Sequence, residues 1–253
     1  MPTPQKRAIV REEKSIAGYA ADSRVISQAT SIAAEAKGID TWLIDLDNTI
    51  YPATVDLFPQ FDARVRDYIV RLLNVSADEA AGLQKKIWDE YGNSLRGLMA
   101  LYNCVPHDFI AHIHDIDLSS IDASPVLDRL LSRLPGRKLI FTSGSALHAE
   151  RVTDRLGVRH HFDGMFDIVA SGFMAKPEMS VYQQLVKRYD FNPARAIMID
   201  DVASNLAPAH QLGMHTVWVR PEPHGSAALK GDHTHIDHET DDLIRFLQNW
   251  LKD

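Results

Sequence analysis

Apolar residues along the chain fall into two alternating patterns. Short, mostly apolar runs, typical of strands buried on both faces, lie at residues 41–44, 138–141, 165–170, 196–199 and 216–219. Around them, apolar residues recur every three or four positions, as in amphipathic helices, over 23–37, 126–134, 146–156, 178–189, 203–212 and 237–252. Strands alternating with helices predict an α/β fold with a doubly wound, Rossmann-like parallel sheet. We expect the strand at 216–219 to close the series.

The stretch between the first two strands has a different texture. Residues 55–73, 94–102 and 106–115 have helical spacing, and Ser76 followed by Glu79 is a capping-box pattern opening a further helix to about residue 91. No strand pattern interrupts this stretch, which predicts an inserted all-helical unit. We therefore expect an N-terminal arm and helix (1–40), an α/β core (41–51 and 125–220), a helical cap (52–124) and a C-terminal tail and helix (221–253).

Composition narrows the class of protein. The 253 residues are 45% hydrophobic and 24% charged, which is ordinary for a soluble globular protein. A net charge of −7 disfavours polymeric nucleic acid as a partner but allows a small phosphorylated metabolite. The single cysteine, Cys104, permits no intrachain disulfide, and no segment approaches a membrane span. We expect a cytoplasmic protein without a membrane partner, either a monomer or a homodimer.

The first strand ends in two aspartates, Asp45 and Asp47, followed by Thr49. Alternate residues of a strand share a face, so the two carboxylates lie close together and repel one another. A divalent cation would compensate them. Taken alone, the pair also fits an ordinary turn or helix cap.

Later strands also end in polar residues. Thr142 and Ser143 precede a helix, as a phosphate seat or as an ordinary N-cap would. Lys176 precedes a proline that starts a helix, where the helix dipole does not favour a cation, so it is either solvated or balances anions in a site. Asp200 and Asp201 follow a third strand as metal ligands or as a helix cap.

Because the carboxyl ends of parallel strands share one edge of a sheet, we expect these residues to meet there. Their order and types resemble the haloacid dehalogenase-like (HAD) superfamily of phosphohydrolases. Its motifs are D-x-D-x-T/V, a strand-end Thr or Ser, a Lys and a paired acidic motif, all present between Asp45 and Asn205. The resemblance implies a Mg²⁺-dependent phosphomonoester hydrolase that acts through an aspartyl-phosphate.

The resemblance also implies a role for each residue. Asp45 would be the nucleophile, and Asp47 would be the general acid and then the base, with its pKa raised by the neighbouring carboxylate. Mg²⁺ would be held by the Asp45 carboxylate, the Asp47 backbone carbonyl, Asp201 directly, and Asp200 nearby or through water. Thr142, Ser143 and Lys176 would hold the phosphoryl group.

Four strings are similar to the pyrimidine 5′-nucleotidase-like branch of this superfamily. They are DLDNTIYP (45–52), EYGNSLRGLM (90–99), FTSGSALHAERV (141–152) and IMIDDVASNL (197–206). This similarity implies a nucleoside 5′-monophosphate as substrate. The branch usually has Asn after the strand-end Thr, where this chain has Ser143. A serine still offers its backbone N–H and a hydroxyl, so this departure could change phosphate positioning but does not argue against catalysis. The helical unit resembles the C1 cap, which selects the leaving group.

Within the predicted cap, Tyr91, Asn93 and Arg96 are candidates to face the leaving group. Tyr91 would stack on a base, or it would simply end a helix and pack inward. His148 would approach the substrate or lie on a helix surface. We expect His233, His235 and His238 to be solvated rather than to bind a metal, because their spacing fits no compact ligand pair.

Three alternatives remain. The same chemistry could act on a sugar phosphate or phosphoglycolate. A dehalogenase is disfavoured because that chemistry uses no metal and does not require Asp47. A catalytically idle binding or regulatory module is disfavoured because no binding role requires Asp45, Asp47, Lys176 and Asp201 together.

Overall fold

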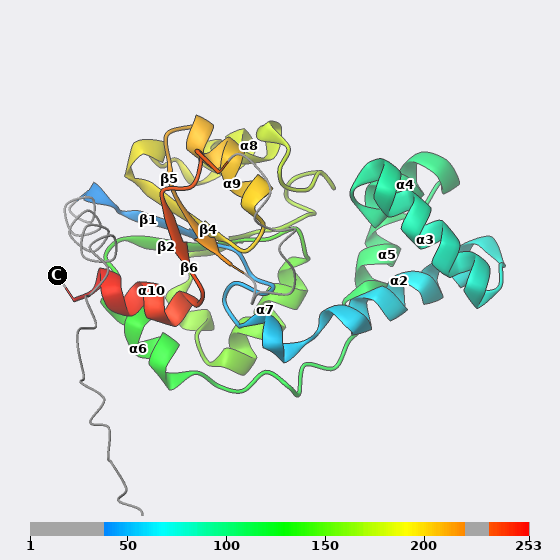
Figure 1. Ribbon diagram of the computed structural model, residues 1–253, viewed down its shortest axis with the longest axis horizontal. Coiled ribbons are helices and arrows are strands. Elements are labelled where there is room, and N and C mark those ends of the chain that lie inside the picture. Colours follow the sequence, from blue (N-terminus) through cyan, green and yellow to red (C-terminus); the bar gives the residue numbers. More distant parts are fainter. Residues whose placement is uncertain (1–37, 221–232, 253) are drawn as a thin grey trace, which may run out of the picture.

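The computed structural model describes residues 38–220 and 233–252, and these form one six-stranded sheet with helices on both faces (Figure 1). All neighbouring strands are parallel, in the order β3-β2-β1-β4-β5-β6. The strands are β1 (Thr41–Ile44), β2 (Arg137–Phe141), β3 (Gly164–Phe166), β4 (Ala196–Asp200), β5 (His215–Val219) and β6 (His238–Thr240). The predicted doubly wound sheet is confirmed. The expected arm and helix before residue 38 lie outside the described residues.

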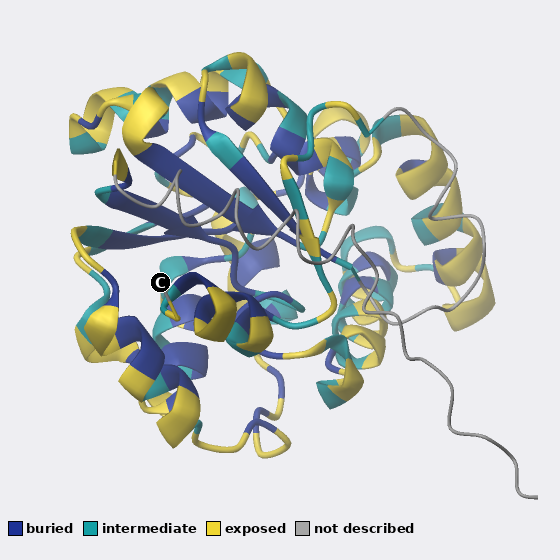
Figure 2. Ribbon diagram, turned by 60° about the vertical axis from the view of Figure 1, so that its left-hand side comes forward, coloured by how far each residue is buried: buried dark blue, intermediate teal, exposed yellow. Residues whose placement is uncertain are grey.

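Strand β1 is central and carries the two halves of the core on its two faces. Trp42 and Ile44 pack with α6 (Pro125–Arg133), α7 (Ala146–Leu156) and α10 (Leu243–Trp250). On the other face, Leu43 packs with α8 (Met179–Tyr189) and α9 (Ala203–Gln211). Figure 2 shows the buried strands between helices whose outer surfaces are exposed. This two-sided burial explains why the strand sequences are continuously apolar.

The strand order creates a switch point beside β1, which is the expected place for a ligand. The chain runs from β1 outward through β2 and β3, then returns to the other side of β1 as β4. In open parallel sheets the crevice at such a switch point, outside the carboxyl ends of the strands, is where ligands bind. Here the residues at those ends are Asp45 after β1 and Asp200 in β4.

Most residues between β1 and α6 form a helical insertion that extends to one side of the sheet (Figure 1). Its helices are η2 (Ala53–Val55), α2 (Phe58–Leu73), α3 (Ala77–Tyr91), α4 (Ser94–Tyr102) and α5 (Pro106–Ile113). The predicted capping box at the start of α3 is present, with Ser76 and Glu79 bonded reciprocally. The insertion has its own apolar cluster, which includes Ile69, Ile87 and Leu98.

Two elements differ from the sequence prediction. Strand β3 ends at Phe166 rather than at residue 170, because the Asp167 carboxylate accepts hydrogen bonds from the backbone N–H groups of Ala146 and Ala170 and turns the chain. The final helix begins at Leu243, not at residue 237, and is preceded by the strand β6. The prediction that the strand at 216–219 closes the sheet is therefore wrong. β6 is a short edge strand of polar residues, so no apolar run in the sequence marks it as a strand.

None of the helices in the described part of the chain is long and apolar enough to cross a membrane.

Candidate active site

Lys176 joins the ends of three strands. Its ammonium donates to Asp45 Oδ1 at 2.6 Å, to Asp200 Oδ2 at 2.6 Å and to the carbonyl of Phe141 at 2.9 Å. These partners lie at the carboxyl ends of β1, β4 and β2. Burial disfavours the ammonium, but Asp200 and Asp45 outweigh burial and hold the pKa of Lys176 above its usual range. The lysine is buried, so the solvated alternative does not hold.

The carboxylates of Asp45, Asp200 and Asp201 form a cluster in which one oxygen of each lies within 4.8 Å of the others. Burial raises the pKa of Asp45 well above its usual range against the opposing effect of Lys176, and the two other aspartates add to the rise. Burial and Asp200 raise the pKa of Asp201 to about 7. Asp200 is fixed by the N–H of Val202 and by the side-chain amide of Asn205, at 2.9 and 3.0 Å.

This cluster fits a hard divalent cation. Three carboxylates face a single ammonium, since Lys176 is the one cationic side chain that hydrogen bonds join to them within the described residues. Burial is the main cause of the raised pKa values of Asp45 and Asp201, and repulsion between the carboxylates adds to it. Oxygen-coordinated Mg²⁺ would compensate this buried negative charge.

The side chain of Asp47 is bonded to residues outside the cluster. Its Oδ1 accepts hydrogen bonds from the Tyr51 hydroxyl at 2.5 Å and from His148 Nε2 at 2.8 Å. Burial acts to raise the pKa of Asp47, but His148 and Tyr51 outweigh it and hold the pKa below its usual range. The expectation that a second carboxylate raises this pKa is wrong, because the neighbours of Asp47 are donors rather than anions.

Two histidines form a buried stack behind Asp47. His148 is fully buried on α7, and its ring lies 4.8 Å from that of His114. His114 Nδ1 lies 3.1 Å from the Ser145 hydroxyl. Burial lowers the pKa of His114 to about 4, and nearby His148 adds to this effect. His148 is thus neither a surface residue nor exposed to a substrate; it holds Asp47.

The loop after β2 places its two hydroxyl residues differently. Thr142 is buried, and its hydroxyl accepts a hydrogen bond from the N–H of Gly144 at 2.9 Å. Ser143 is exposed and lines the cavity beside the insertion. The N-cap of α7 is Ser145. Neither Thr142 nor Ser143 is therefore the helix cap.

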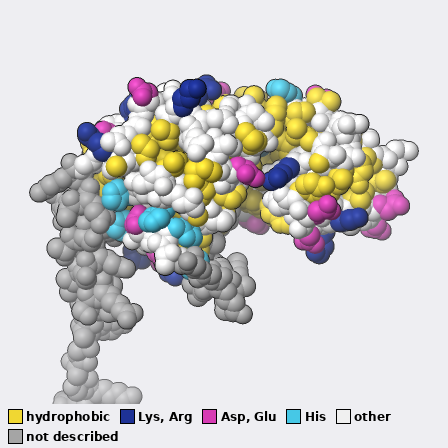
Figure 3. Space-filling view, turned by 90° about the horizontal axis from the view of Figure 1, so that it is seen from above, with side chains coloured by type: hydrophobic (Ala, Val, Ile, Leu, Met, Phe, Trp, Pro, Cys, Tyr) yellow, Lys and Arg dark blue, Asp and Glu magenta, His cyan; other side chains and the backbone are white. Residues whose placement is uncertain are grey.

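A cavity of about 580 Å³ lies between the insertion and the core. Ser143 and Ile168 line its core side, His114 lines it at the end of α5, and apolar side chains line most of the rest. The lining residues from the insertion include Phe58, Phe61, Val65, Trp88, Leu95, Phe109, Ile110 and Ile113, with the polar Asp62, Arg66, Gln84, Lys85, Asn93 and Ser94. The space-filling view shows the insertion as a lobe beside the core, with hydrophobic side chains exposed on both (Figure 3).

Of the three insertion residues singled out from sequence, Asn93 lines this cavity and also caps α4 by accepting the N–H of Arg96 at 3.0 Å. Tyr91 packs within the insertion: a Cβ added at Gly97 would lie 3.1 Å from its ring, so α3 and α4 approach closely there. Arg96 donates to Glu178 at 3.0 Å and so joins the insertion to the core.

The histidines near the C-terminus pack against the core. The His233 ring stacks on Trp218 at 5.1 Å, and His235 Nε2 lies 2.8 Å from the carbonyl oxygen of Ala203. The expectation that these two are solvated is wrong. His238 begins β6. In the described part of the chain these histidines form no metal-binding group.

The residues of the carboxylate cluster were predictable from the sequence, but the partners of Asp47 were not. His148 was a candidate to approach the substrate, not to bond to Asp47. Tyr51 lies in the string DLDNTIYP (45–52), but nothing in the sequence marks it as a partner of Asp47. His114 follows the last helix of the insertion and carries no sequence signal.

Comparison with known proteins assigns the family. The profile of haloacid dehalogenase-like hydrolases matches residues 39–213. Phosphate metabolism protein 8 of Saccharomyces cerevisiae is 27% identical over 195 residues, which are 68% of this chain and 59% of that protein. Glyceraldehyde 3-phosphate phosphatase of Methanocaldococcus jannaschii is 24% identical over 231 residues, 86% of this chain and 94% of the relative.

Among solved structures, a HAD phosphatase from Thermococcus onnurineus matches with a TM-score of 0.58 and 20% identity, over 85% of this chain and 98% of that one. This likeness shows the fold. The chain spans less than two thirds of the yeast relative and 6–14% of three longer relatives. The profile match nevertheless covers most of the chain and includes Asp45, Thr142, Lys176 and Asp201. The chain therefore belongs to the haloacid dehalogenase-like hydrolases.

Proposed function

We propose that this protein is a Mg²⁺-dependent phosphomonoester hydrolase that acts through an aspartyl-phosphate on Asp45. The observation that carries the proposal is the contact of Asp45 with Lys176 inside the carboxylate cluster, at the switch point of the sheet. Two phosphatases are among its similar proteins, and the phosphatase names belong to those proteins. Bound Mg²⁺, held by Asp45, Asp200, Asp201 and the Asp47 carbonyl, would supply positive charge to the phosphoryl oxygens.

Each residue of the site has its own role in the proposed reaction. A carboxylate oxygen of Asp45 attacks phosphorus, and the bond from phosphorus to the leaving oxygen breaks. Asp47 donates a proton to that oxygen, then accepts a proton from the water that hydrolyses the aspartyl-phosphate and restores Asp45. Lys176, Thr142 and Ser143 hold the phosphoryl group.

The lowered pKa of Asp47 suits the second step, because the ionised form is the base. For the first step Asp47 must hold a proton, and an entering phosphate dianion favours protonation because it repels a neighbouring carboxylate. Tyr51 and His148 both donate to Oδ1, which leaves Oδ2 for the proton that moves.

We further propose that residues 52–124 act as a cap over the core (41–51 and 125–220) and that the substrate is a nucleoside 5′-monophosphate, preferably a pyrimidine one. The cavity beside Ser143 supports this choice, since its aromatic lining from Phe58, Phe61 and Trp88 suits the flat face of a base. A sugar phosphate or another small phosphorylated metabolite is the second candidate, favoured by the glyceraldehyde 3-phosphate phosphatase relative.

The test is phosphate release from UMP, CMP, AMP, GMP, sugar phosphates and phosphoglycolate, with Mg²⁺ and again with EDTA. We expect Mg²⁺-dependent release, strongest with UMP or CMP, and none from an Asp45→Asn variant of unchanged circular dichroism. Release strongest with a sugar phosphate would keep the mechanism and discard the nucleotidase assignment. No release from any compound would favour the binding module, and full activity of Asp45→Asn would remove Asp45 from the mechanism.

A further inference from the structure

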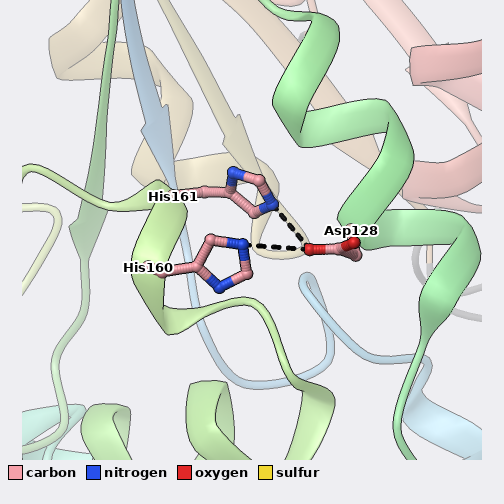
Figure 4. A group of neighbouring side chains, drawn as sticks. All are labelled: Asp128, His160 and His161. Atoms are coloured by element: carbon pink, nitrogen blue, oxygen red, sulfur yellow. Dashed lines mark hydrogen bonds and ion pairs between the residues drawn. The ribbon is translucent and has the colours of Figure 1, made fainter.

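Three side chains that commonly bind metals converge where α6 meets the short turn after α7. Asp128 lies in the first turn of α6, and His160 and His161 lie in the short turn η3 (Arg159–His161) after α7. His161 Nε2 lies 2.8 Å from Asp128 Oδ1, and His160 Nε2 lies 3.2 Å from the same oxygen (Figure 4). All three atoms lie within 4.8 Å of one another.

The backbone does not force this convergence. A 3₁₀ turn has three residues per turn, so consecutive side chains ordinarily point about 120° apart. Here the two rings lie 4.0 Å apart, and both direct Nε2 at one carboxylate oxygen. Arg159, the other basic residue of the turn, pairs with Glu150 and Asp154 instead. Asp128 therefore pairs with the two imidazoles and not with Arg159.

The two distances to Asp128 are close to the ligand–ligand spacing of a coordination shell. Tetrahedral Zn²⁺ with ligand distances of about 2.0–2.1 Å holds its ligand atoms about 3.3 Å from one another. The separation of 3.2 Å between His160 and Asp128 already matches, and the 2.8 Å separation from His161 must open by about 0.5 Å. The side chain of His161 is 12% exposed and so held in place, whereas that of His160 is 65% exposed and free to adjust.

We propose that Asp128, His160 and His161 bind a divalent transition-metal ion of the Zn²⁺ class, with water completing the shell on the exposed side. Imidazole nitrogen favours Zn²⁺, Cu²⁺ and Ni²⁺, whereas the all-oxygen cluster around Asp45 suits Mg²⁺, so the two sites select different ions. The bound ion ties α6 to the turn η3 and thereby stabilises the core. No residue of this site contacts Asp45, Lys176 or the cavity in any described hydrogen bond or ion pair.

The test is calorimetric titration of the full chain with Zn²⁺ in an excess of Mg²⁺. The chain has twelve histidines, so the comparison needs a matched control, and His210→Ala removes an exposed histidine on α9. We expect wild type and His210→Ala to share one site that is weakened at least about tenfold in His160→Ala, His161→Ala and Asp128→Asn. Electron paramagnetic resonance with Cu²⁺ should show two coupled nitrogens in wild type and one in His160→Ala.

A second readout follows thermal unfolding. Zn²⁺ should raise the midpoint of wild type and of His210→Ala by more than that of His160→Ala, because an ion that binds only the folded state stabilises it in proportion to its affinity. His160 is mostly exposed, so this variant folds even if replacement of His161 disturbs the turn. The proposal is overturned if the three variants bind Zn²⁺ as wild type does. It is equally overturned if the Zn²⁺ site is lost only in Asp201→Asn, because the ion then occupies the carboxylate cluster.

Discussion

Lys176 is placed so that its removal has two separate consequences. It is buried, and it donates to Asp45 and Asp200, both at 2.6 Å. We expect Lys176→Met to lower kcat/KM by orders of magnitude, since one missing transition-state charge costs about 3 kcal/mol. Without Mg²⁺ it should also lower the free energy of unfolding by about 3–5 kcal/mol, because two buried carboxylates lose their partner. Urea unfolding and steady-state rates measure the two effects.

The control for that experiment is Lys187→Met, which replaces an exposed lysine on α8. It should leave both quantities unchanged. A mild effect of Lys176→Met on turnover would mean that Lys176 does not contact the phosphoryl group.

His148 is a positioning residue for Asp47. It is fully buried and holds Asp47 Oδ1 at 2.8 Å. We expect His148→Leu, which keeps the volume but loses the donor, to lower kcat by about 100-fold with little change in KM, because Asp47, the proposed acid and base, loses its orientation. His148→Gln retains a donor and should recover most of the rate. Equal rates for the Leu and Gln variants would show that only packing matters at this position.

His114 makes stability depend on pH. Its folded-state pKa is about 4, below the usual value of 6.5, so the unfolded chain binds more protons between these values. Stability should therefore fall as pH falls, by about 2 kcal/mol between pH 7 and pH 5 from this residue. Urea unfolding at the two pH values measures the slope, and His114→Gln should reduce it by that amount. An unchanged slope in His114→Gln would assign the pH dependence to other groups.

At the residue scale the sequence could predict which side chains meet, because Asp45, Thr142 and Asp200 all follow apolar strands and parallel strands end at one edge. It could not predict the partners of Asp47. His148 lies 101 positions away from Asp47, and its orientation depends on the packing of α7. The sign of the Asp47 pKa shift follows from that contact, so it could not be predicted either.

At the scale of elements, α10 closes one face of the sheet. Trp250 at its end is 5% exposed and meets the ring of Trp42 in β1 edge-on at 5.3 Å. We expect Trp250→Ala to lower the free energy of unfolding by about 3–5 kcal/mol, because it leaves a cavity over the central strand. Gln248→Ala, on the exposed side of the same helix, should change it little. A loss below about 1 kcal/mol for Trp250→Ala would mean that α10 is not part of the cooperative core.

Elements with a strong apolar period were predictable, and short polar ones were not. The bounds of α7 and the capping box of α3 follow from local residues. Strand β6 has three residues, His238 to Thr240, and exists only because β5 offers it an edge to pair with. Strand β3 stops early because Asp167 bonds to the start of α7, a contact between distant segments.

At the scale of the whole molecule, the insertion and the core meet around the cavity and at the ion pair of Arg96 with Glu178. Both partners of that pair are more than half exposed, so it contributes little stability by itself. The division of the chain at residues 52 and 124 stays a prediction, as does the role of the insertion as a cap. If the cap selects the leaving group, a change in its cavity should alter the preference between substrates and leave the chemistry at Asp45 intact.

Trp88 tests this selection directly. It lies on α3, lines the cavity and is 60% exposed, so Trp88→Ala should change the free energy of unfolding by no more than about 0.5 kcal/mol. Stacking of a base on an aromatic side chain contributes about 1–3 kcal/mol. We therefore expect kcat/KM for UMP to fall by about 10–100-fold, mainly through KM, while that for phosphoglycolate, which has no base, stays within about twofold.

The matched control is Leu101→Ala, which removes an exposed hydrophobic side chain of the same insertion, on α4 and outside the cavity lining. It should leave both substrates unaffected. An equal loss for UMP and phosphoglycolate in Trp88→Ala would mean that Trp88 shapes the insertion rather than binding a base. Full activity on both would place the leaving group elsewhere, and the nucleotide preference would then need another part of the cavity, such as Phe58 or Phe61, to explain it.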